Sequence, residues 1–124
     1  MKKYITGDLL HYKICNAKYL IEVTNTSKHG YCFKGVKDNF NGVICDEFIK
    51  DIPLTPEILE KNGWKKDKDG YFNDSYHIRL CKSNTNYAAY KVVNNSIVWL
   101  RAVENVPDLQ HLLFGLDISL KIEV

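Results

Sequence analysis

One segment in the middle of the chain, IPLTPEILEKNGW, carries both a start signal and a stop signal for a short helix. Thr55 can cap the helix through its hydroxyl, and Pro56 fits the first helical position, where the missing amide proton is not needed. At the other end, Asn62 and Gly63 tolerate the left-handed backbone that closes many helices. A helix of about two turns is marginal by itself, so it must pack against the rest of the chain. The segment therefore predicts a short bracing helix, after which Trp64 returns to the core.

Apolar and polar residues alternate along the chain before this helix, which is typical of half-buried strands. The alternation predicts strands at residues 9–14, 19–23, 31–36 and 43–49. Turn residues at 25–30 and the hairpin-favouring pair Asn41-Gly42 separate these strands. Four or five short strands at this spacing predict a small, strongly bent sheet or barrel, and specifically an SH3-like barrel.

The chain after the helix is predicted to be a meander of strands with a second helix near its end. The strands are expected at residues 64–66, 71–73, 76–82, 87–94 and 97–103, with tight turns at 67–70 and at Asn94-Asn95. Asn105 is a suitable cap for a helix from residue 106 to about 116. The apolar stripe of that helix, which should cover the sheet, consists of Val106, Leu109, Leu112, Leu113 and Leu116. Alternation at 118–124 predicts a final strand.

Together these elements predict a single compact α+β domain over residues 1–124. Its first part, 1–54, would be the SH3-like β unit. Its second part, 55–124, would hold the short capped helix and an antiparallel sheet covered by the C-terminal helix. A chain of 124 residues is long enough to bury a self-sufficient core without disulfides or metals.

Charge and hydropathy exclude several classes of protein. The formal net charge is +2, with eight lysines and six acids in residues 1–54 and nine basic and nine acidic residues in 55–124. Neither half is strongly basic, which argues against a dominant role in phosphate binding. Polar residues interrupt the N-terminal segment and no apolar run could cross a bilayer, so neither a secretory signal nor a membrane partner is predicted. The expected compartment is the cytoplasm.

Histidines and cysteines form no recognisable catalytic or metal-binding motif. The cysteines are expected to be buried free thiols, although a disulfide framework is a formal alternative; they are Cys15, Cys32, Cys45 and Cys81. The histidines are equally scattered, with surface positions expected for the second and fourth; they are His11, His29, His77 and His111. Asp67 and Asp69 lack the rest of a calcium loop, and the common phosphate-binding and hydrolase signatures are absent. The sequence therefore predicts no catalytic residue, metal or cofactor, and favours a protein that is not an enzyme.

The segments IPLTPEIL, followed by NGW, and VPDLQHLLFGL occur together in this chain. In this pairing the chain resembles a family of small uncharacterised proteins of Bacteroidetes, their phages and conjugative elements, which have segments similar to IPLTEEIL and VHQLQNLYFAL. The matching positions in the second segment are Leu109, Gln110, Leu112, Phe114 and Leu116. The chain differs from the family at Pro107, at Gly115 and after Asp117. The resemblance covers most of the chain and implies origin and fold, but no activity.

A candidate binding surface lies on the predicted second sheet. His77 and Arg79 alternate away from the apolar residues of one strand, and Trp99 and Arg101 share a face of another. If the meander brings them together with Lys91, the open side of the sheet is a basic and aromatic platform that can stack bases and contact phosphates. The favoured alternative is an ordinary solvated face with Trp99 in the core, because a one-residue slip in register moves every side chain to the other face.

Phe114 lies off the apolar stripe of the C-terminal helix. It either fills a gap under a neighbouring loop or marks a contact with another protein or subunit. The absent catalytic motifs and the near-neutral charge favour a non-enzymatic protein that binds a protein partner, as an accessory factor of a phage or mobile element. The alternative is a module that binds single-stranded nucleic acid through the barrel or the platform. A small enzyme is a third and weaker hypothesis, and a homo-oligomer is compatible with the sequence.

Overall fold

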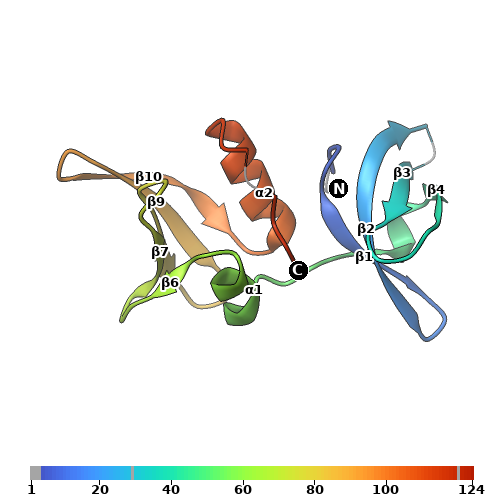
Figure 1. The fold of residues 1–124 in the computed structure, drawn as a ribbon, viewed down its shortest axis with the longest axis horizontal. Helices are drawn as coiled ribbons and strands as arrows, with labels where there is room; N and C mark the ends of the chain where they lie inside the picture. The colour runs from blue at the N-terminus through green and yellow to red at the C-terminus, as the bar shows by residue number, and fades with distance from the viewer. Residues whose placement is uncertain (1–3, 29, 120) are drawn as a thin grey trace. The chain divides into compact units, whose positions relative to one another are not determined.

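The structure is a computed structural model that describes residues 4–28, 30–119 and 121–124. The chain divides into two compact units, residues 1–52 and 53–124. Each unit contains a five-stranded antiparallel sheet, and the second unit also contains the helices α1 and α2 (Figure 1). The predicted α+β class with antiparallel sheets is therefore confirmed. That the units form one domain over 1–124 stays a prediction.

The first sheet is a meander whose last strand returns to its first. The strands are β1 (Leu9–Ile14), β2 (Ala17–Ser27), β3 (Gly30–Gly35), β4 (Asn41–Ile44) and β5 (Ile49–Asp51), with a 3-10 turn at Asp46–Phe48. Their spatial order is β4-β3-β2-β1-β5. Within the described residues no pairing joins the edge strands β4 and β5, so the predicted closed barrel is not confirmed.

The hairpin turn predicted at Asn41-Gly42 is wrong. Both residues belong to β4, and the chain turns at residues 36–39 instead. Gly42 faces Phe33 across the strand pair, and a Cβ at Gly42 would lie 3.4 Å from the Phe33 ring. The pair therefore continues the strand rather than forming a turn, and a Cβ at Gly42 would be in ordinary van der Waals contact with the ring.

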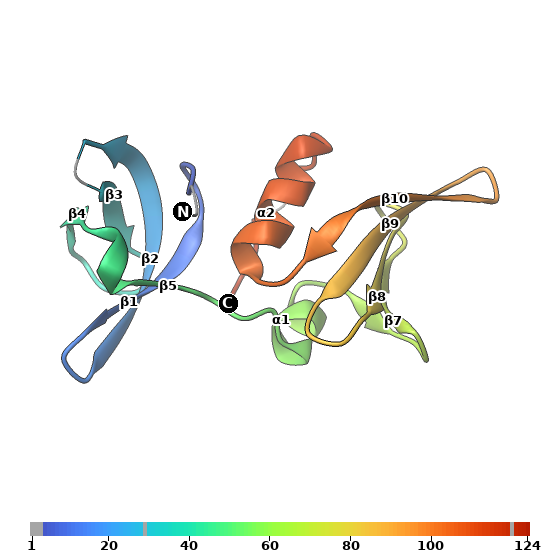
Figure 2. The ribbon, with the colours of Figure 1, turned by 180° about the vertical axis from the view of Figure 1, so that it is seen from behind.

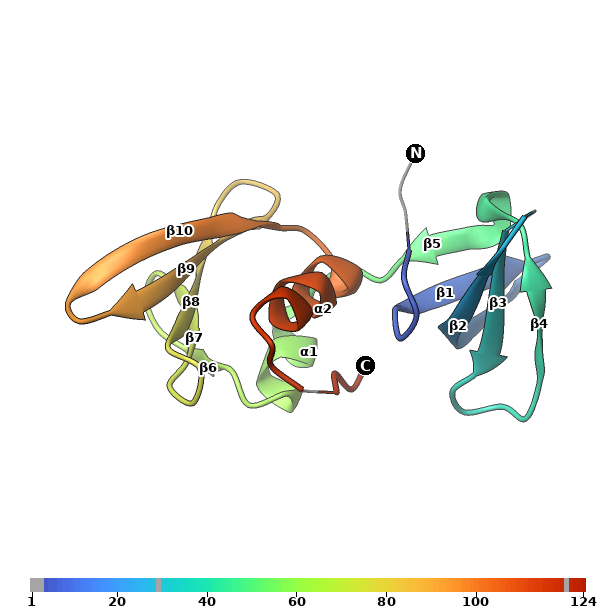
Figure 3. The same cartoon turned by 90° about the horizontal axis from the view of Figure 1, so that it is seen from above.

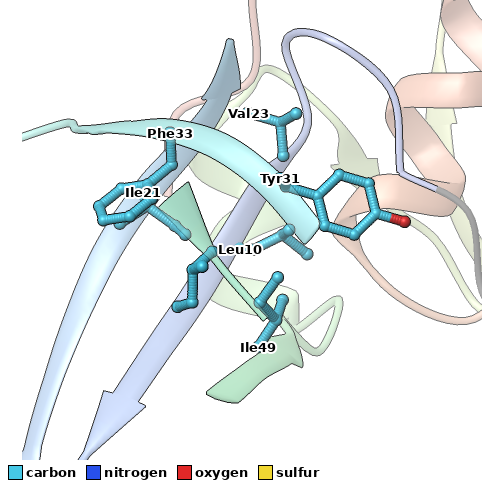
Figure 4. Close-up of a cluster of buried hydrophobic side chains, with 7 residues drawn as sticks. Leu10, Ile21, Val23, Tyr31, Phe33 and Ile49 are labelled. Carbon is cyan, nitrogen blue, oxygen red and sulfur yellow. The ribbon is translucent and has the colours of Figure 1, made fainter. Parts of the chain in front are cut away.

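The core of the first unit lies on one face of this sheet (Figure 4). Leu10 lies opposite Ile21, so the predicted alternation of β1 and β2 delivers both side chains to the same face. The buried cluster consists of Leu10, Ile21, Val23, Tyr31, Phe33, Ile44 and Ile49. Half-buried aromatic rings extend it, with ring centroids 5.6 Å apart for Tyr12 and Phe33 and 5.3 Å for Tyr19 and Phe40. Edge contacts between such rings stabilise the end of the core.

The second sheet is a simple meander of the kind that the sequence predicts. Its strands are β6 (Lys65–Lys66), β7 (Gly70–Asn73), β8 (Ile78–Lys82), β9 (Tyr87–Val93) and β10 (Ser96–Val103), and they lie in the order of the chain. The turn between β9 and β10 is formed by Asn94 and Asn95, whose φ angles are 47° and 67°. Two successive left-handed residues are typical of a tight hairpin turn, as predicted.

Both predicted helices begin at their predicted caps. In α1 (Pro56–Lys61) the Thr55 hydroxyl accepts a hydrogen bond from the backbone N–H of Ile58, and Gly63 closes the helix with a φ of 87°. In α2 (Val106–Gly115) the side-chain oxygen of Asn105 accepts from the N–H of Asp108 at 2.9 Å. Each cap satisfies an amide that has no partner inside the helix.

Helices α1 and α2 lie on the same face of the second sheet (Figures 2 and 3). The buried residues of α2 are Val106, Pro107, Leu109, Leu112 and Leu113, which include four of the five positions of the predicted stripe. Leu59 of α1 and Trp64 after it are also buried, as expected. The covered face of the sheet contributes Tyr71, Ile78, Leu80, Tyr87, Ala89 and Val103. The sheet therefore has one covered face and one open face.

The predicted final strand at 118–124 is wrong, because the described residues of this segment pair with no strand. Asn62 holds the segment instead. Its side-chain N–H donates to the Glu123 carbonyl and its side-chain oxygen accepts from the Glu123 N–H, both at 2.7 Å. This two-way bond imitates one rung of a sheet and brings the buried Ile122 against the unit.

We expect Asn62→Ala to lower the free energy of unfolding of the second unit by about 2 kcal/mol, because it removes both bonds to Glu123 and a third to the Ile58 carbonyl. Urea unfolding checks this value. Amide hydrogen exchange should become faster at Glu123, whose N–H loses its partner. Lys61→Ala, which removes one exposed bond to the Val124 carbonyl, is the control and should change little.

Candidate functional site

The open face of the second sheet carries a continuous row of side chains across β7 to β10. Phe72 lies opposite Arg79, Arg79 opposite Tyr90, and Tyr90 opposite Trp99. Directly opposed residues of an antiparallel pair share a face, with Cβ atoms about 4.5–5.5 Å apart. These four side chains therefore form one line, here called the aromatic row. It lies away from the helices, because the residues that alternate with it along β7, β8 and β9 are buried.

Small residues lie on one side of the aromatic row and branched apolar residues on the other. The small residues oppose one another in neighbouring strands; they are Gly70, Cys81, Ala88 and Ala102. On the other side, Val92 lies opposite Ile97, and both are exposed. On the open face, the large side chains of the aromatic row therefore stand beside a line of small residues. An apolar side chain of a partner can pack on the small residues against the rings.

Strand β10 is an edge of the sheet, and its first half is apolar and exposed. The exposed fraction is 65% for Ile97, 50% for Val98 and 60% for Trp99. The sequence-based view of Trp99 as a core residue is therefore wrong. No charged residue occurs between Asn94 and Leu100, although edge strands usually carry charges that block pairing with other chains. An uncharged apolar edge of this kind is a feature of interaction surfaces.

A bulge in β10 separates Trp99 from Arg101. The register shifts between them, so that Trp99 pairs with Tyr90 whereas Arg101 pairs with Ala89. Because Tyr90 and Ala89 point to opposite faces of the sheet, Trp99 and Arg101 do so as well. Arg101 Nη2 instead donates to Asp108 Oδ1 on α2 at 3.2 Å. The prediction that Trp99 and Arg101 share a face is wrong, because one extra residue reverses the alternation.

Arg79 belongs to the aromatic row, but its guanidinium is already paired with a carboxylate. Its guanidinium forms an ion pair with Asp67 and lies over the Phe72 ring, 6.0 Å from the ring centroid. Burial raises the pKa of Asp67, but the amide of Asp69, the Arg79 guanidinium and the amide of Gly70 outweigh it and hold that pKa below its usual value. Arg79 therefore stays paired at neutral pH and orients the row.

Lys91 and His77 do not join this face. Lys91 lies opposite Ile78 on the covered face, and its Nζ donates to the Tyr76 carbonyl at 2.8 Å. His77 lies in the turn before β8, with a φ of 56°, so the alternation of the strand does not apply to it. The platform of three cations and a tryptophan is therefore not assembled.

Phe114 is 75% exposed on α2, so it does not fill a gap under a loop. Of the six predicted surface residues, the structure brings together only Arg79 and Trp99. Phe72 and Tyr90, which complete the aromatic row, are not among the residues predicted from the sequence. Their signal is present, since each is an aromatic residue one position away from a buried one, but it has meaning only once the register of four strands is known.

The cysteines differ from expectation in burial. None is buried: two are exposed and two are half-buried, and all four are free. Their predicted burial is wrong, because they occupy turns and the open faces of the sheets. His111 is half-buried on α2, and His29 lies outside the described residues. Among the residues that the structure describes, no three His, Cys, Asp or Glu side chains converge to hold a metal ion.

A pocket of about 280 Å³ lies at the β6 end of the second unit. Its lining comprises Pro56, Lys66, Asp67, Lys68, Asp69, Gly70, Tyr71, Lys82 and Tyr87. The turn amides of Asp69 and Gly70 are already bonded to Asp67 Oδ1, so they offer nothing to an anion. Burial raises the pKa of both tyrosines, which stay neutral. The lining has three lysines and two aspartates, and Asp67 is already paired with Arg79, so the pocket holds no matched pair of groups for acid–base work.

Comparisons of the chain with protein-family models, with curated proteins and with solved structures found no match. The resemblance of IPLTPEIL and VPDLQHLLFGL to a Bacteroidetes family therefore stays a prediction. In the part of the chain that the structure describes, no helix is both long and apolar enough to cross a bilayer.

Proposed function

We propose that this chain is a non-enzymatic binding protein that engages a protein partner through the aromatic row and the exposed half of β10. The observation that carries the proposal is Trp99, a large apolar side chain left 60% exposed near Ile97 in the uncharged first half of the edge strand β10. Tryptophan and tyrosine dominate the binding energy of protein interfaces, and such residues gather at the centre of the contact.

An extended segment is the form of partner that this site suits. The outer edge of β10 has unpaired backbone groups, because β9 occupies only its inner edge. A partner strand added there would gain backbone hydrogen bonds and would place alternate side chains against Trp99 on one face and Val98 on the other. The bulge after Trp99 limits such pairing to the first half of β10.

The nucleic-acid alternative finds less support at this sheet. Arg79 and Arg101 each form an ion pair with an aspartate, and they lie on opposite faces. To contact a phosphate, each arginine would first have to break its ion pair, and this cost offsets the free energy of the new contact. Salt-dependent binding of single-stranded nucleic acid that weakens in both Arg79→Ala and Arg101→Ala would contradict this reasoning.

The proposal includes three more specific statements, on the fold of the first sheet, the compartment and the biological role. The first sheet is an SH3-like module opened between β4 and β5, which the meander of four strands and the return of β5 to β1 support. The protein acts in the cytoplasm as an accessory factor of a phage or mobile element, which the resemblance of its two segments to the Bacteroidetes family supports. None of the three statements is needed for the binding surface itself.

We expect Trp99→Ala to weaken partner binding by about 30-fold, which corresponds to about 2 kcal/mol for a central tryptophan. Affinity capture from the native host, followed by titration of the captured protein, measures this. Phe114→Ala removes a ring from α2 that is even more exposed and is the matched control, with binding expected to change less than about threefold.

Tryptophan fluorescence gives a second readout. Trp64 is buried, so a shift to shorter wavelength when the partner binds would come from Trp99. Partner binding that survives Trp99→Ala but fails in Phe114→Ala would move the site to α2. Turnover of a nucleotide or peptide by the purified protein would refute the non-enzymatic proposal. A dimer in sedimentation that Trp99→Ala dissolves would identify the partner as a second copy of this chain.

A further inference from the structure

The outer face of the first sheet gathers basic side chains that are far apart in the sequence. Lys13 lies opposite Lys18, and His11 lies opposite Lys50. His11 and Lys13 alternate with Leu10 and the other core residues of β1, so they point to the face away from the core. The four side chains, His11, Lys13, Lys18 and Lys50, are here called the basic face.

No carboxylate in β1, β2 or β5 neutralises the basic face. Glu22 is further along β2 and forms an ion pair with Lys34 at 3.8 Å. Asp51 pairs with Leu10 and therefore points to the opposite face. Like charges that face each other across strands destabilise a sheet. The repulsion is felt by His11, whose pKa is lowered by burial and then by Lys18 and Lys13.

The basic face continues onto a projecting hairpin. The last residue of β1 that pairs with β5 is Tyr12, and the first residue of β2 that pairs with β3 is Ile21. Strand pairing of residues 13–20 is therefore within the β1–β2 hairpin alone. Figures 1 and 2 show this β1–β2 hairpin extending past the other strands of the sheet. Lys13 and Lys18 are exposed side by side on it. A two-stranded ribbon with cations on one face has the width that the major groove of a duplex admits.

The chemistry of the face narrows the class of partner. Protein interfaces need a buried apolar or aromatic centre, and β1, β2 and β5 place no Phe, Tyr or Trp ring on this face. Single-stranded nucleic acid is bound by stacking on such rings, which are also missing here. Attachment to an anionic membrane takes clusters of about 4–8 lysines or arginines. Binding to the backbone phosphates of a duplex requires only exposed cationic side chains, such as lysines on neighbouring strands.

We propose that the basic face binds the phosphate backbone of a double-stranded nucleic acid. The contact is sequence-independent and electrostatic, with Lys13, Lys18 and Lys50 each replacing a counterion on a phosphate. It is separate from the protein-binding surface proposed above, and neither proposal depends on the other.

Fluorescence anisotropy with a labelled duplex DNA of about 20 base pairs tests the proposal. For the intact chain the logarithm of the binding constant should fall with the logarithm of salt concentration with a slope of about −3, one unit for each lysine. Lys13→Ala/Lys18→Ala should bring the slope to about −1 and weaken binding at least about tenfold in low salt. Lys28→Ala/Lys121→Ala removes the same charge from exposed positions off this face and should leave the affinity within about twofold.

A second variant separates binding from folding. Lys13→Glu places a carboxylate opposite Lys18, so the melting temperature should rise while duplex binding is lost. In Lys13→Ala/Lys18→Ala the pKa of His11, followed by NMR titration, should rise toward its ordinary value. No duplex binding by the intact chain, equal losses in the control pair, or equally tight binding to polyglutamate, anionic vesicles or single-stranded DNA would each overturn the proposal.

Discussion

Gly70→Ala should destabilise the second unit by about 3 kcal/mol or more. Gly70 begins β7 with a φ of 154°, a conformation that residues with a Cβ rarely adopt. A Cβ at this position would also lie 2.0 Å from the backbone carbonyl oxygen of Leu80, which cannot move without breaking the pairing of β7 with β8. Strain in the backbone and a steric clash therefore act together.

Urea unfolding followed by tryptophan fluorescence measures this loss, because both tryptophans, Trp64 and Trp99, belong to the second unit. Gly115→Ala is the matched control. Gly115 ends α2 and has no atom within 4 Å of an added Cβ, so alanine should raise the free energy of unfolding by about 0.5 kcal/mol. Equal stability of the two variants would show that β7 does not approach β8 at Gly70.

Leu10→Ala should destabilise the first unit by about 3 kcal/mol, within the usual range for a buried leucine. Leu10 is 0% exposed, and its side chain meets Ile21 at the centre of the core cluster. Removing one methine and two methyl carbons there leaves a cavity that the paired strands cannot close. Ile14→Ala, at the exposed end of the same strand and on the same face, should cost less than about 1 kcal/mol.

The same variant tests the sequence-based prediction of a single domain. Residues 1–52 contain no tryptophan, so tryptophan fluorescence follows the second unit alone, whereas circular dichroism reports the sheets of both units. In one cooperative domain all transitions coincide, and Leu10→Ala shifts them together. A tryptophan transition that stays in place would contradict the single domain and would establish two independently folding units.

The elements that the sequence predicts correctly are those that depend on neighbours along the chain. Thr55 and Asn105 cap their helices because a capping side chain needs only the amides of the next turn. The Asn94-Asn95 turn follows from the tolerance of asparagine for left-handed backbone. Where the local signal is ambiguous, as at Asn41-Gly42, pairing with β3 places both residues within β4 instead of in a turn.

The candidate site depends on relations that the chain does not display locally. A single bulged residue in β10 moves Arg101 to the covered face and leaves Trp99 on the open one. Phe72 and Tyr90 can be recognised as part of the candidate site only when the strand pairing places them in line with Trp99. The basic face arises in the same way, since Lys13 and Lys18 are neighbours across a hairpin and Lys50 returns from far along the chain. The number of charges in residues 1–54 does not indicate this cluster, because the count says nothing about which side chains share a face.

The sequence by itself determined where helices begin and end, most of the stretches that become strands, and that the chain combines α and β structure. These follow from caps, turns and alternation, which act over a few residues. Only the tertiary structure decided which side chains share a face, which strands are edges, and which cations are already paired. The physical reason is that the side-chain period of a strand is two, so one unpredicted bulge or shift in register reverses every later position. Local chemistry thus specifies the elements of this protein, and the pairing of distant strands specifies its surfaces.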